Sequence, residues 1–154
     1  MAITTAFKAF SNNAVDKFSA IANGVNRVAA KVPTADVLTL GTYAELIPAP
    51  GAGKAIKVLG FETEVRTAGT AYATNTALNV ITDTADQAQF TDAVVLTSTA
   101  ARVVNGTQVA ATGATNKQLI ANKGVGLKST GNPATGTFDI YVYIDYIVVD
   151  LGQL

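Results

Sequence analysis

The sequence predicts a mainly β protein: an antiparallel, jelly-roll-like β-sandwich that follows an N-terminal helical arm. After residue 34, apolar side chains recur with a period of two, which is typical of half-buried strands. Turn residues separate these segments at intervals of roughly ten residues, as in two packed antiparallel sheets. Before that point the apolar steps are three and four residues, which indicates a helix. We therefore expect an arm, residues 1–33, and a sandwich domain, residues 34–154.

The arm carries an apolar stripe at helical spacing. Its members are Phe7, Phe10, Ala14, Phe18, Ile21, Val25, Val28 and Val32. Gly24 interrupts the stripe, and because glycine in a helix costs roughly 1 kcal/mol against alanine, it could instead end a first helix before a shorter second one. The stripe packs either on its own domain or on a partner. The partner-binding candidates of the arm are Phe7, Phe10, Phe18 and Ile21.

Basic residues are concentrated at the N-terminal end. Residues 1–35 hold four lysines and arginines against one aspartate, a net charge of +3, and the rest of the chain carries −3. This charge is too sparse for a nucleic-acid footprint but favours an acidic protein surface. No segment has the length and apolar character of a membrane span or the pattern of a secretory signal. We expect a protein made in the cytoplasm that binds neither nucleic acid nor membrane.

The clearest strand covers residues 137–149. One face carries the apolar series Phe138, Ile140, Val142, Ile144, Tyr146 and Val148. The opposite face carries Asp139, Tyr141, Tyr143 and Asp145. The apolar face belongs to the core, whereas the other face is either solvated or a contact surface, since tyrosine is enriched at interfaces. Tyr141 and Tyr143 therefore join the partner-binding candidates.

A second long strand is predicted over residues 54–66, with a β-bulge at Gly60, where the alternation of apolar residues changes phase. The preceding Pro48–Gly53 segment and Lys54 look at first like a phosphate-binding loop. A Walker A loop needs glycine where Pro48 stands and a hydroxyl where Ala55 stands. The segment is therefore predicted to be a rigid turn, in which Lys54 has no binding role.

Shorter strands complete the set, with turns every ten residues or so, a pattern typical of a sandwich. They are predicted over residues 37–40, 46–47, 75–82, 93–98, 101–104, 107–111, 118–121 and 124–128. Asn105-Gly106 is predicted to form a type I′ hairpin turn, because both central residues of that turn need positive φ.

The chain contains no histidine and no cysteine, which excludes a Ser-His-Asp triad, a thiol nucleophile and the usual zinc sites. Glu62 and Glu64 lie on one face of their strand and are best explained as a solvated face. Asp83 and Asp86 lack the regular ligand spacing of a calcium loop. We therefore expect no catalytic residue, no metal and no cofactor.

Four segments occur in an order that is similar to a known family. They are Leu46–Val58, Ala71–Leu78, Asn122–Leu127 and Gly131–Gly136, and the last precedes the long C-terminal strand. From about Glu45 to Val149 the chain resembles small virion proteins of tailed bacteriophages, of the head decoration, cement or head-fibre type. The first 33 residues lie outside this resemblance.

The resemblance implies a homotrimer of β-sandwiches on the outer surface of a virion. Such a trimer would bridge neighbouring capsomers of the major capsid protein and stabilise the shell, a role that needs no catalytic residue. Two alternatives stay open. A head-fibre or receptor-binding module would adhere through loops such as residues 67–75 and 112–117. A carboxylate glycosidase would depend on Glu62 and Glu64.

Overall fold

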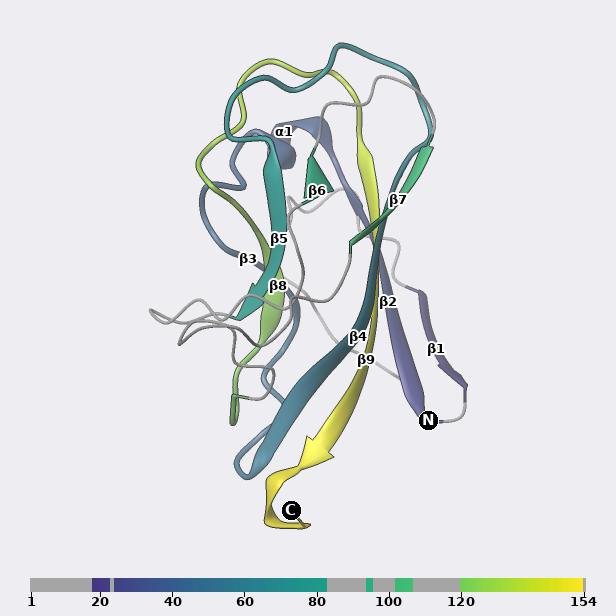
Figure 1. The fold of residues 1–154 in the computed structure, drawn as a ribbon, viewed down its shortest axis with the longest axis vertical. Helices are drawn as coiled ribbons and strands as arrows, with labels where there is room; N and C mark the ends of the chain where they lie inside the picture. Colours follow the sequence, from purple (N-terminus) through teal and green to yellow (C-terminus); the bar gives the residue numbers. More distant parts are fainter. Residues whose placement is uncertain (1–17, 23, 83–93, 96–101, 107–119, 154) are drawn as a thin grey trace.

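The computed structural model describes residues 18–22, 24–82, 94–95, 102–106 and 120–153. Two antiparallel sheets face each other, so the predicted β-sandwich is confirmed (Figure 1). The elements in chain order are β1 (Phe18–Ala22), β2 (Val25–Val32), α1 (Thr34–Val37), β3 (Ala44–Ile47), β4 (Lys54–Val65), β5 (Ala77–Thr82), β6 (Val94–Val95), β7 (Arg102–Gly106), β8 (Val125–Ser129), β9 (Ile140–Asp150) and the 3-10 helix η1 (Leu151–Gln153).

The first sheet has the strand order β1-β2-β9-β4-β7, and the second has the order β3-β8-β5-β6. Strand β9 is the centre of the first sheet, because it pairs with β2 on one side and with β4 on the other. Its alternation agrees with the sequence prediction: Ile140, Val142 and Ile144 are fully buried. Together with apolar side chains of the second sheet, such as Leu78 and Leu127, they form one core between the sheets.

The predicted bulge in β4 is confirmed. Val58 lies opposite Tyr146, whereas Gly60 lies opposite Asp145, so Leu59 is the extra residue. The core-facing side chains therefore change phase from Val58 to Phe61, both of which are buried. One inserted residue lets this long strand keep both ends of its apolar face on the core.

The predicted helix is wrong for residues 18–22 and 25–32, which form a β-hairpin at the side of the first sheet. Strand β2 pairs with β9 from Asn26 opposite Tyr146 to Val32 opposite Ile140, so the sandwich includes residues assigned to the arm. Val28, Ala30 and Val32 are buried alternately, which is a strand period. Residues 1–17, with Phe7 and Phe10, lie outside the described residues.

Two shorter predictions are also wrong. Residues 37–40, predicted as a strand, are instead the last residue of α1 and a turn, and α1 itself begins after Pro33. Val37 and Leu40 are nevertheless buried. Asn105 and Gly106 do not form a turn, because they pair within β7 opposite Glu62 and Phe61. The strand expected at 107–111 and the first half of the strand expected at 118–121 lie outside the described residues; in the second half, Ala121 forms an isolated bridge with Ala55.

Candidate functional site

Tyr141 and Tyr143 lie on the face of the first sheet that points away from the core, as predicted, and both are partly buried. Across the sheet, Tyr143 lies between Ala29 and Glu62. We call this surface the tyrosine face and define it by the outward residues of three adjacent strands and the residues next to them. They are Arg27, Ala29, Lys31, Glu62, Glu64, Arg66, Asp139, Tyr141, Tyr143 and Asp145.

Glu64, Arg66 and Tyr143 form a closed set of hydrogen bonds on this face. The Tyr143 hydroxyl donates to Glu64 Oε2 at 2.8 Å and accepts from Arg66 Nη2 at 2.7 Å. Arg66 Nε donates to the same Glu64 oxygen at 3.0 Å. The Arg66 guanidinium also lies 4.0 Å from the centre of the Tyr141 ring, a cation–π contact. These contacts restrict the positions of both tyrosine side chains.

The same contacts set the protonation of the cluster. The hydrogen bond from Tyr143, assisted by Arg66, lowers the pKa of the Glu64 carboxyl. Burial and the neighbouring Glu64 raise the pKa of the Tyr143 hydroxyl. Glu64 therefore stays ionised and Tyr143 stays protonated at neutral pH. This is the pairing in which the hydroxyl donates to the carboxylate.

Arg27 and Asp145 form a bidentate ion pair between β2 and β9. The Arg27 Nε and Nη2 atoms each lie 2.6 Å from a different oxygen of Asp145. The hydrogen bond to Asp145 raises the pKa of Arg27, and the charge of Glu62 contributes in the same direction. Because a guanidinium and a carboxylate match in shape, this pair also fixes the relative position of the two strands.

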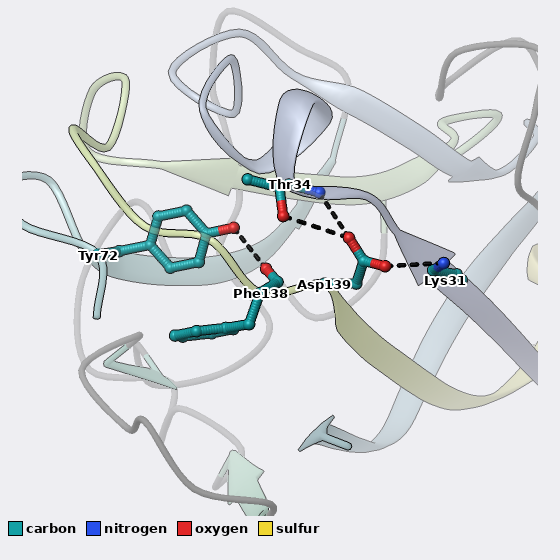
Figure 2. Close-up of polar contacts among 5 residues, drawn as sticks. All are labelled: Lys31, Thr34, Tyr72, Phe138 and Asp139. Atoms are coloured by element: carbon teal, nitrogen blue, oxygen red, sulfur yellow. Dashed lines mark hydrogen bonds and ion pairs between the residues drawn. The ribbon is translucent and has the colours of Figure 1, made fainter. Parts of the chain in front are cut away.

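Asp139 connects three elements at the other end of the tyrosine face (Figure 2). Its Oδ2 lies 2.7 Å from Lys31 Nζ in β2, and its Oδ1 accepts the Thr34 backbone N–H at 2.9 Å and the Thr34 hydroxyl at 3.2 Å. Burial disfavours the charged carboxylate, but the bonds from Lys31 and Thr34 outweigh it, so the pKa of Asp139 is lowered. Asp139 thus joins the start of α1 to the start of β9.

The three cations of the tyrosine face lie within ion-pair distance of three of its carboxylates: Arg27 with Asp145, Lys31 with Asp139, and Arg66 with Glu64. Such a surface can be covered by a partner without leaving these charges unpaired, which lowers the desolvation cost. Its chemistry suits recognition of a protein surface. Among its carboxylates, Glu64 is held by both Tyr143 and Arg66.

Two other segments were considered as binding sites from the sequence: the Pro48–Gly53 turn with Lys54, and the loop that contains Asp83 and Asp86. The Pro48–Gly53 turn is confirmed: Gly51 and Gly53 have φ of 103° and 73°, and Lys54 is exposed at the start of β4. Asp83 and Asp86 lie outside the described residues. The part of the chain that the structure describes contains no group of acidic side chains that could hold a metal ion. No helix in that part is long and apolar enough to span a membrane.

Of the candidates of the predicted arm, Phe7 and Phe10 lie outside the described residues, whereas Phe18 and Ile21 belong to β1. Phe18 occupies the β1 position opposite Ala29, and Ile21 the position opposite Asn26. The ion pairs of Arg27 and Lys31 were missed, because these residues were assigned to a helix. The alternation of Arg27, Ala29 and Lys31 with Val28, Ala30 and Val32 is the signal that would have found them.

The fold has a counterpart among solved structures. A chain of the structure described as "Capsid of Ralstonia phage GP4" is similar with a TM-score of 0.50 and 18% sequence identity, over 82% of this chain and 86% of that chain. A chain of the structure described as "CBM4 structure and function" covers 88% of this chain and 89% of its own length, with 17% identity and a TM-score of 0.36. No protein-family model and no curated protein matches this sequence.

Proposed function

We propose that this protein is a structural component of a bacteriophage virion, which decorates and stabilises the capsid from its outer surface as a homotrimer. The observation that carries the proposal is the shared fold over most of both chains with a protein from a phage capsid. The sequence resemblance from Glu45 to Val149 to phage head decoration proteins supports the same role independently. The partner implied is the major capsid protein, which the trimer would contact across neighbouring capsomers.

The tyrosine face is the surface proposed to contact the capsid shell. Tyr141 and Tyr143 are held in place by Arg66 and Glu64, so little side-chain entropy is lost when a partner covers them. Tyrosine and arginine are enriched among the residues that contribute most to binding. The ion pairs around them supply the polar rim that a protein interface needs.

A binding experiment with empty, expanded capsids of the phage that encodes the protein tests this role. We expect the wild-type protein to co-sediment with the shells, and light scattering of the free protein to report three chains. The double variant Tyr141→Ala, Tyr143→Ala should bind at least about tenfold more weakly, because two central anchors are lost. The matched control is Thr130→Ala, an exposed residue that follows β8 of the second sheet. A wild-type protein that does not bind the shells would refute the proposal.

One observation favours the adhesion module as a second candidate. The loops before β5 and before β9 pair through Ala73 and Ala134, whose backbones exchange hydrogen bonds of 2.8 and 2.7 Å. Beside this pair, Thr74, Asn75 and Thr135 have positive φ, a costly conformation that is concentrated at functional sites. A glycan-binding screen tests this candidate: binding that is retained by the tyrosine double variant but lost on shortening the 131–137 loop would support it.

A further inference from the structure

A second surface lies at the far end of the first sheet. We call residues 54–59 of β4 and 146–150 of β9 the distal ribbon. Its end, residues 54–57 and 147–150, extends beyond the last pair of β2 with β9, Asn26 with Tyr146, at the lower end of Figure 1. From Asp139 to Asp145, β9 alternates between polar outward and apolar inward residues. That alternation stops at Tyr146, which is followed by Ile147, Val148 and Val149. A strand that is apolar on both faces is normally covered on both faces.

In the free chain this cover is incomplete. Val148 is 46% exposed and Leu59 is 37% exposed, the exposed large hydrophobic residues of the part that the structure describes. Ile147 and Val149 are partly exposed as well. By contrast, Ile140, Val142 and Ile144 of the same strand are fully buried. Exposed apolar side chains therefore occur on both strands: Val148 lies opposite Ile56 near the end of β9, and Leu59 is the bulge residue of β4.

The strand edge is extended in the same place. Strand β9 last pairs with β2 at Tyr146, opposite Asn26, but it continues to pair with β4 as far as Asp150, opposite Lys54. Its final residues thus run past the end of β2. An exposed strand edge with apolar side chains beside it is a recurrent site of association between chains.

The charges of the distal ribbon indicate what covers it. Lys54 and Lys57 lie on the β4 side and Asp150 lies on the β9 side. None of these three forms a salt bridge with another of the described residues. A ribbon that is basic on one side and acidic on the other is complementary to a second copy of itself placed head to tail. Repeated head-to-tail contacts close into a ring when the rotation permits.

We propose that the distal ribbon is the contact between copies of this chain. Lys57 and Leu59 of one copy face the end of β9 in the next, so that Lys57 approaches the neighbour's Asp150 while Leu59 and Val148 are covered. The β4 edge at Lys54 and Ala55 takes no part in this contact, because Ala121 and Asn122 of the same chain already pair with it. The number of three copies rests on the proposed function, but the contact itself does not. The tyrosine face stays free for another partner.

The first test measures the mass of the purified full-length protein by light scattering over a concentration series. We expect the wild type to be oligomeric. Val148→Asp and Leu59→Asp should each weaken association, so that these variants are still single chains at concentrations at least tenfold above those at which the wild type dissociates. Val148→Thr, which keeps the shape of the side chain, should shift it in the same direction, and circular dichroism checks that each variant is folded. Ala35→Asp, at an exposed position in α1, is the control and should leave the mass unchanged.

The second test is a charge exchange. Lys57→Glu and Asp150→Lys should each weaken association at least tenfold, and the two changes in one chain should restore it, because the charges then match again across the contact. A wild-type monomer, or an oligomer that is indifferent to Val148→Asp and to the charge exchange, would overturn the inference. The outcomes separate this contact from capsid binding. A monomer that binds shells would keep the capsid-binding role but rule out both this contact and the homotrimer. An oligomer that depends on Val148 but does not bind shells would keep the contact and rule out the capsid-binding role.

Discussion

The Tyr72 hydroxyl donates a hydrogen bond of 2.6 Å to the backbone carbonyl of Phe138, and the two aromatic rings meet edge to face with centroids 4.8 Å apart (Figure 2). Both side chains are buried, with 2% exposure each. This relationship holds the loop between β4 and β5 against the chain just before β9. It also places Asp139, the next residue, where it can bind Lys31 and Thr34.

Removing the Tyr72 hydroxyl should destabilise the protein clearly. We expect Tyr72→Phe to lower the free energy of unfolding by about 1–3 kcal/mol, since a buried carbonyl loses its side-chain partner. The measurement is denaturant unfolding followed by circular dichroism. Tyr141→Phe on the outer face, the matched control, should change the stability by less than about 0.5 kcal/mol. Equal effects of the two variants would contradict the structural role of Tyr72.

Replacing Gly136 or Gly51 by alanine should separate the cost of a steric clash from the cost of a strained backbone. Both have positive φ, of 92° and 103°. A Cβ at position 136 would meet the Tyr72 ring, whereas a Cβ at position 51 has no neighbour within 4 Å. Gly51→Ala should therefore cost about 1–2 kcal/mol, from the strained φ alone. Gly136→Ala should cost about 3 kcal/mol or more, because the clash is added to the strain. Thermal unfolding of both variants measures the difference, and similar values would be evidence against the packing of Tyr72 over Gly136.

Two N-terminal truncations should behave differently. Deleting residues 1–17 leaves every described strand, and we expect a cooperatively folded protein. Deleting residues 1–33 removes β1 and β2, including the buried Val28, Ala30 and Val32, and exposes the edge of β9. We expect the shorter protein to be unfolded or aggregated, as seen by circular dichroism and light scattering. This reverses the expectation from sequence, in which residues 1–33 formed a separate arm. A folded 34–154 fragment would show that β2 is dispensable.

Acid should weaken the link made by Asp139. Its pKa is lowered in the folded protein, so the unfolded chain takes up the proton first as the pH falls. The contribution to stability is therefore complete above about pH 4, the ordinary value for aspartate, and is lost as the pH falls through the lower folded value. When the free energy of unfolding is measured with denaturant from pH 6 to pH 2.5, it should decrease less steeply with falling pH in Asp139→Asn than in the wild type.

Lys31→Met offers a direct check of the cause. Without the ammonium group, the pKa of Asp139 should rise, which carboxyl titration by NMR measures. In a protein that already carries Asp139→Asn, adding Lys31→Met should change the pH dependence of the free energy of unfolding very little. An unchanged Asp139 pKa in Lys31→Met would mean that Thr34, rather than the ion pair, keeps the carboxylate charged.

Features that depend on the local pattern of residues could be predicted from the sequence. The strict alternation of residues 138–145 fixed both faces of β9, since a strand that alternates has only one way to bury its apolar side. The phase change at Gly60 located the bulge, and the glycines at 51 and 53 located the turn, because each reflects the geometry of its own few residues. The tyrosines of the outer face followed from the same alternation.

Whether residues 18–22 and 25–32 form helices or strands depends on long-range pairing, which local pattern does not show. Their valines and alanines fit a helical stripe and a strand equally well, but β9 offers a long edge, and pairing with it buries Val28, Ala30 and Val32. The same pairing brings Arg27 to Asp145 and Lys31 to Asp139, contacts between residues more than a hundred positions apart. Asn105-Gly106, which has the sequence of a hairpin turn, pairs along β4 instead. Local preference is worth about 1 kcal/mol per residue, so long-range pairing and burial outweigh it.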